Sequence, residues 1–209
     1  MNLVPSDLTT ASRWAAREFE RLPPTRWDAI SSDIEWTVRR TVDHLADTML
    51  LYSAYVARRA RDRVFPPRNG DASASNPELI NAFESGAAVL ERLLGDFGAH
   101  ERAFHPSGLA DLTGWIGLAC TEIIVHTSDA CGRNTGAIPH EIDVIAGATV
   151  DRVLPWTPLD GSGVERLLWA TGRAFLGELP PEPSDWWWHS APLSEWARSP
   201  HRRSAPPEW

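Results

Sequence analysis

The chain has 209 residues, of which 43% are hydrophobic and 23% are charged, as expected for one globular domain with or without an appendage. All 20 basic side chains are arginine. The absence of lysine excludes Schiff-base enzymes, Walker A nucleotide sites and protein kinases, although arginine in place of lysine is also what a GC-rich genome produces. The formal net charge of −8 disfavours nucleic acid as a partner.

The sequence has no feature that would place it in or across a membrane. No apolar run reaches the length of about 18 residues that spans a bilayer, and residues 1–10 lack the basic and apolar stretches of a signal peptide. The two cysteines, Cys120 and Cys131, fall in one predicted helix roughly 16 Å apart, which is too far for a disulfide. We therefore expect a cytoplasmic protein whose thiols lie in the core.

Apolar residues recur at helical spacing along most of the chain. Helices are predicted at about residues 8–21, 36–62, 76–94, 109–133, 139–153 and 162–177. No alternation typical of a strand extends over a useful length, so the fold is predicted to be all-α with four longer helices and two additional short ones.

The last part of the chain differs in character, because proline and tryptophan replace the helical pattern from Leu179 onward. A disordered tail rarely carries this much tryptophan. We expect an extended segment that packs its indoles on the body of the protein or on a second subunit, with about the last ten residues loose. The run Trp186–Trp188 could stack on a sugar-like ligand, but plain packing is favoured.

Two residues of the predicted helix 109–133 have the spacing of metal ligands. Glu122 and His126 are one turn apart, with Cβ atoms about 6 Å apart, and such pairs build metal sites inside helical bundles. The pair alone is a weak signal, because it occurs in many helices by chance. His44, beside the core residue Leu45, strengthens it, because an inward imidazole needs a partner. Together they indicate a three-ligand site with open positions, and a histidine satisfied within the core is the alternative.

Two more polar residues lie on the same face of that helix. Asp129 is one turn beyond His126, and Arg133 is one turn further. Asp129 could orient the His126 imidazole or be a fourth ligand, and Arg133 could contact the substrate. A surface ion pair between Asp129 and Arg133 is an equally good interpretation.

The residues Trp36-Thr37-Val38-Arg39, His44-Leu45-Ala46 and the motif Glu122-x-x-x-His126-x-x-Asp129 resemble the DinB/YfiT-like superfamily. More narrowly, the chain resembles the N-terminal domain of the mycothiol-dependent maleylpyruvate isomerases of actinobacteria over about residues 8–155. The resemblance implies a four-helix bundle that binds a divalent ion, commonly zinc, through His44, Glu122 and His126. It also implies a DinB-like metal-binding bundle of residues 1–155 and a C-terminal extension of residues 156–209.

The same resemblance implies a chemistry. A metal site with three protein ligands keeps a position where the thiol of mycothiol can bind and lose its proton. The thiolate would then attack an electrophilic small molecule, giving isomerisation or S-transfer. The isomerases have a compact α/β C-terminal domain, whereas this chain has only some 55 residues there, which favours a related transferase or thiol-exchange activity.

Two other functions are kept as alternatives. One is a non-catalytic protein that binds a metal or a small molecule, and the other is a hydrolase that activates water on the metal. The electrophile, the metal and the oligomeric state are left open, with a homodimer as one alternative because bundles of this size often dimerise.

Overall fold

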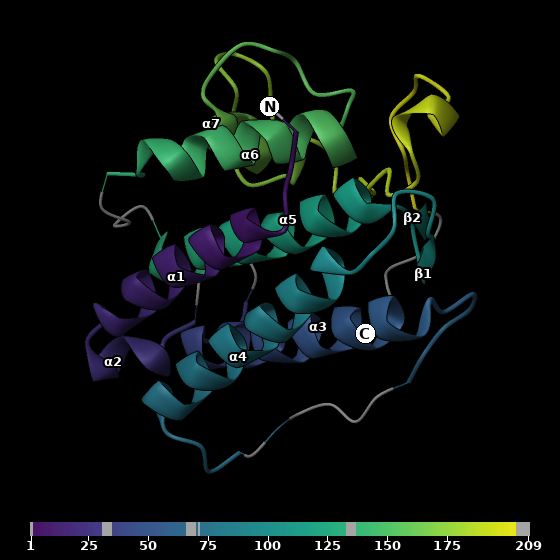
Figure 1. Cartoon of the computed structure of the whole chain (residues 1–209). Coiled ribbons are helices and arrows are strands. Elements are labelled where there is room, and N and C mark those ends of the chain that lie inside the picture. The colour runs from purple at the N-terminus through teal and green to yellow at the C-terminus, as the bar shows by residue number, and fades with distance from the viewer. Residues whose placement is uncertain (1, 31–34, 66–69, 71, 133–136, 204–209) are drawn as a thin grey trace.

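The computed structural model describes residues 2–30, 35–65, 70, 72–132 and 137–203 (Figure 1). The elements in chain order are α1 (Ser6–Glu20), α2 (Pro24–Trp27), α3 (Val38–Arg58), α4 (Asn76–Gly95), β1 (Ala103–His105), β2 (Gly108–Ala110), α5 (Leu112–Cys131), α6 (His140–Val153), α7 (Gly163–Ala170) and a 3₁₀ turn (Leu193–Glu195). Helices dominate the described part of the chain, which confirms the predicted all-α class.

Helices α1, α3, α4 and α5 form a four-helix bundle, as the family resemblance implied (Figure 1). Helix α3 packs against α4 and α5, and α1 packs against the same two helices. The apolar stripe predicted on α3 is its buried face, where Val42, Leu45 and Met49 are fully buried. Thr37 caps the start of α3 by accepting a hydrogen bond from the backbone N–H of Arg40.

Helix α5 lies at the centre of the molecule. Sixteen of its 20 residues are buried, because α1 and α3 cover it from the bundle and α6 covers it from outside. A helix covered on all sides is apolar all round, so its sequence shows no single apolar stripe. Charged residues on such a helix must find partners, and Glu122 and Asp129 are both buried there.

The two short helices add a layer beside the bundle, with α6 on α5 and α7 on α6 (Figure 1). Gly163 lets α7 approach α6 closely, since a Cβ there would lie 2.0 Å from the carbonyl oxygen of Asp143. The prediction that the last helix continues to residue 177 is wrong. It ends at Ala170, because Gly172 turns the chain with a φ of 79°.

A small hairpin precedes α5, and because of it the predicted start of that helix is wrong. Strands β1 and β2 pair antiparallel, with Ala103 opposite Ala110 and His105 opposite Gly108. The helix that was predicted from residue 109 therefore starts at Leu112, where Asp111 accepts a hydrogen bond of 2.7 Å from the N–H of Gly114. A strand of three residues is too short to show the alternation of apolar and polar side chains by which strands are predicted.

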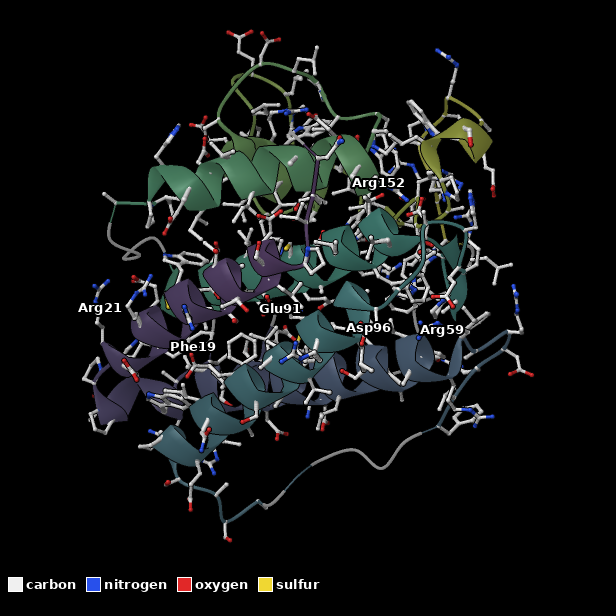
Figure 2. All side chains as sticks on the ribbon, in the orientation of Figure 1. Phe19, Arg21, Arg59, Glu91, Asp96 and Arg152 are labelled. Carbon is white, nitrogen blue, oxygen red and sulfur yellow. The ribbon has the colours of Figure 1, made fainter. Side chains whose placement is uncertain are left out.

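The proline- and tryptophan-rich segment returns across the start of α5. The N–H of His189 donates to Val153 O at 2.8 Å, and the guanidinium of Arg152 donates to the carbonyl oxygens of His189 and Ser190. Figure 2 labels Arg152 on the ribbon near this segment. The carbonyl of Ser190 lies so close to α5 that a Cβ on Gly114 would be 2.2 Å from it. Residues 204–209, which cover most of the end expected to be loose, lie outside the described residues.

Candidate metal centre

The structure brings together the three side chains that the sequence singled out. His44 comes from α3, and Glu122 and His126 come from successive turns of α5. One ligand atom from each lies within 4.8 Å of the others. In the described part of the chain this is the one group of three or more histidine, cysteine, aspartate and glutamate side chains so arranged.

The distances suit a divalent ion. Glu122 Oε2 lies 3.5 Å from His44 Nε2 and 3.2 Å from His126 Nε2. With metal–ligand bonds of about 2.0–2.2 Å, neighbouring donors of a tetrahedral site are about 3.3 Å apart. The side chains are only 16%, 5% and 12% exposed for His44, Glu122 and His126, so ligand atoms face a sheltered space rather than bulk water. Two imidazoles and one carboxylate are a donor set that zinc accepts.

Asp129 forms a hydrogen bond with Nδ1 of His126, the ring nitrogen that faces away from Glu122. Its Oδ2 lies 3.0 Å from His126 Nδ1, so the Nδ1–H donates to the carboxylate and Nε2 faces Glu122. Asp129 thus lies behind the imidazole, on the side away from Glu122. Its partner is Arg173, which donates through Nε and Nη2 at 3.2 and 3.0 Å. Arg133 lies outside the described residues.

Glu122 has a second contact on the side away from the histidines. The hydroxyl of Tyr52 donates to Glu122 Oε1 at 3.4 Å, and the same hydroxyl lies 3.4 Å from Nε2 of the buried His105. His105 Nδ1 accepts from the backbone N–H of Ser107 at 3.2 Å, so the proton of the neutral ring is assigned to Nε2. The hydrogen bonds therefore run from His105 through Tyr52 to Glu122.

Contacts between opposite charges favour the ionised forms of His126 and Glu122. Burial opposes the charged form of His126, but hydrogen bonds with Asp129 and Glu122 outweigh it and raise its pKa to about 9. Burial likewise opposes the carboxylate of Glu122, yet its contacts with His126 and His44 hold its pKa below the usual range. By contrast, burial lowers the pKa of His105 to about 3, which keeps that ring neutral.

A cavity of about 450 Å³ opens beside the three candidate ligands. One wall belongs to the bundle, with His44, Glu122, Val125 and His126. The other wall belongs to the C-terminal part of the chain and includes Thr171, Gly172, Arg173, Ser184, Trp186, Trp187, Trp188 and Arg203. The tryptophan segment therefore lines the same cavity as the candidate metal ligands.

Aromatic rings cover the histidines. Trp36 stacks on His126 with ring centroids 5.9 Å apart and meets His44 edge-on at 5.0 Å. On the far wall Trp188 is buried against Trp186 and Trp187, and Arg203 lies over the ring of Trp187. The cavity thus combines several tryptophan rings with charged and polar side chains, and both kinds of group occur in small-molecule sites.

The two cysteines take no part in this cavity. Both are buried in α5, and neither belongs to the residues that line the cavity. Burial raises the pKa of the Cys131 thiol to about 12 and raises that of Cys120 further. A thiol in that state is a poor nucleophile, so sulfur chemistry in this cavity would require a thiol from outside the chain.

Sequence reasoning missed Tyr52, His105 and Arg173. Tyr52 carried a signal, since it follows His44 at a spacing of eight residues and therefore lies on the same side of α3. No signal in the sequence indicated His105 or Arg173, because their contacts depend on the hairpin and on the turn after α7.

Comparison with known proteins identifies the family of the chain and a structure with a similar fold. Residues 8–131 match the mycothiol maleylpyruvate isomerase N-terminal domain. No curated protein sequence matches the chain. The fold is similar to the crystal structure of a histidine-to-alanine mutant of the mycothiol-dependent maleylpyruvate isomerase, with a TM-score of 0.59 and 15% identity over 87% of this chain and 97% of that chain. At this identity the similarity is one of fold, and it extends beyond the bundle. The chain belongs to the family of the mycothiol maleylpyruvate isomerase N-terminal domain.

Proposed function

We propose that this protein is a metal-dependent enzyme that uses mycothiol to transform an electrophilic small molecule, by S-transfer or isomerisation. The observation that carries the proposal is the three-ligand group at the base of a 450 Å³ cavity, in a chain that belongs to a mycothiol-related family. Zinc is the ion we expect at His44, Glu122 and His126. A bound divalent ion would lower the pKa of a coordinated thiol, as it does for any metal-bound acid.

Other residues of the chain would position the ligands, line the cavity and supply a positive charge. Asp129 and Tyr52 hold His126 and Glu122 by their outer atoms, so their inner atoms stay directed at one point. Trp36 and Trp188 line the cavity and would shield a bound substrate from water. Arg203, for which no ion pair is found among the described residues, offers a positive group opposite the ligands.

The division of the chain is part of the proposal. Residues 1–155 would form the metal-binding bundle, and residues 156–209 would form an extension that completes the cavity wall. A cytoplasmic location also belongs to it, because a low-molecular-weight thiol is kept reduced there. The described residues contain no helix with the length and apolar character needed to cross a bilayer.

The metal assignment is tested by elemental analysis of the purified protein and of the variants His44→Ala and His126→Ala. We expect close to one divalent ion per chain in the parent and almost none in either variant. His100→Ala, which changes an exposed histidine in a turn, is the matched control and should keep the ion. Full metal content in both site variants would exclude the ligand assignment.

The thiol requirement is tested with a model electrophile such as 1-chloro-2,4-dinitrobenzene, with mycothiol present and absent. Consumption that needs both the metal-loaded protein and mycothiol supports the proposal. Hydrolysis without any thiol would indicate the water-activating alternative, since the same ion could activate water. Tight binding without consumption would indicate a binding protein.

A further inference from the structure

Arg173 links the C-terminal part of the chain to the candidate metal centre. It contacts Asp129, and Asp129 contacts the candidate ligand His126. Arg173 follows Gly172 in the turn after α7, forty-four positions from Asp129. Its Nε and Nη2 donate to the two oxygens of Asp129, and its Nη1 donates to Thr171 O at 2.6 Å. Both sides of the guanidinium are therefore fixed, one by the bundle and one by its own turn.

Asp129 in turn touches a candidate ligand. Its side chain is 1% exposed and accepts from His126 Nδ1 at 3.0 Å. A carboxylate shared between an imidazole and an arginine has little freedom to rotate, because each oxygen has a donor of fixed direction. The orientation of the His126 ring thus depends on where the turn after α7 places Arg173.

The turn at Gly172 and Arg173 is fixed by its backbone conformation and by hydrogen bonds. Gly172 has a φ of 79°, and a Cβ there would lie 3.0 Å from Glu182 O. The N–H of Arg173 donates to Leu168 O, and the N–H of Glu182 donates to Trp169 O, so the turn is tied to α7 and to the start of the tryptophan segment. Arg173 also lines the cavity together with Trp186 and Trp187.

We propose that Arg173 is a positioning residue that acts through Asp129 on His126, so that metal binding by the bundle and docking of residues 171–188 stabilise each other. The inference rests on the proposed metal site. Because binding free energies are linked reciprocally, a docked extension raises metal affinity and a bound metal holds the extension in place. The C-terminal wall of the cavity is then held more firmly when the metal is bound.

The test is a double-mutant cycle on zinc affinity, measured by competition with a chelator, for the parent, Arg173→Gln, Asp129→Asn and the double variant. Loss of a group behind a metal ligand typically costs about 10–100-fold in affinity. We expect about tenfold weaker binding for Arg173→Gln and a larger loss for Asp129→Asn. The double variant should bind no more weakly than Asp129→Asn, since Arg173 acts through that residue.

Two further variants separate positioning from general stability. Arg198→Gln changes an exposed arginine of the same extension that lies outside residues 171–188, and it should leave zinc affinity unchanged. Arg173→Lys keeps the charge but loses the two-pronged contact, so its affinity should lie between those of the parent and Arg173→Gln. If Arg173→Gln fails to fold, Arg173→Lys carries the same test.

Hydrogen exchange supplies the reciprocal readout. Zinc should slow amide exchange in residues 171–188 of the parent, and this protection should be lost in Arg173→Gln. Unchanged zinc affinity in Arg173→Gln, or losses that simply add in the double variant, would overturn the inference and leave the proposed function intact. A parent protein that binds no divalent ion would overturn both.

Discussion

At the scale of single residues, the two oxygens of Glu122 have different partners. Oε2 faces the two histidines, whereas Oε1 accepts from the hydroxyl of Tyr52. Because His105 donates to that hydroxyl and is held neutral by burial, the hydroxyl keeps its own proton for Glu122. This arrangement favours one oxygen of Glu122 as the metal ligand.

Tyr52→Phe should therefore weaken zinc binding, by up to about tenfold, since it removes a hydrogen bond behind a ligand. It should also lower the free energy of unfolding by about 1 kcal/mol, because the buried His105 loses its partner. Tyr55→Phe is the matched control, as Tyr55 is buried on the same helix and its hydroxyl accepts from the N–H of Val64. Equal zinc affinity in both variants would contradict the role given to Tyr52.

The ionisation of His126 predicts a pH dependence of metal binding. Its pKa is raised to about 9 in the absence of an ion, and the imidazole must lose its proton before Nε2 can bind a metal. Zinc affinity should rise with pH from 6 towards 9, by up to about tenfold per pH unit for one released proton. Titration by chelator competition across this range measures the slope, and an affinity that is flat with pH would contradict it.

At the scale of elements, spacing within one helix made part of the site predictable. Glu122 and His126 share a face of α5 wherever that helix lies, and His44 was located by its place beside the buried stripe of α3. Partners supplied by other elements could not be predicted in this way. Arg173 reaches Asp129 only because α7 packs on α6, and single-sequence periodicity carries no information on such packing.

The close contact of α5 with the tryptophan segment gives an element-scale prediction. Gly114→Ala would place a Cβ 2.2 Å from Ser190 O, so the segment must move away from the start of α5. We expect a loss of about 1–3 kcal/mol in the free energy of unfolding, measured with urea, and faster proteolysis within residues 184–203.

Gly95→Ala is the matched control, because nothing lies within 4 Å of a Cβ at that position. Alanine has the higher helix propensity, so this change at the end of α4 should be neutral or slightly stabilising. If Gly114→Ala were as stable as Gly95→Ala, the segment would not be docked as the structure shows.

At the scale of the whole molecule, the bundle could be predicted and the cavity could not. The bundle follows from helical periodicity and from a motif of locally spaced residues, and both are properties of short stretches of sequence. The second wall is an irregular chain held by single contacts such as Arg152 to Ser190 O. The composition of residues 179–209 predicted that tryptophans would pack, but not that Trp186 and Trp187 would face His44 and His126 across one cavity.

A shared cavity predicts that a bound metal stabilises the molecule as a unit. Zinc at 100 times its dissociation constant should raise the free energy of unfolding by about 2.7 kcal/mol, which corresponds to roughly 5–10 °C in Tm for a chain of this size. His126→Ala should abolish the shift. Tryptophan fluorescence reports on both walls and circular dichroism on the helices, so the two transitions should coincide and move together. Stabilisation of the circular dichroism transition alone would mean that the C-terminal wall unfolds independently of the metal-binding bundle.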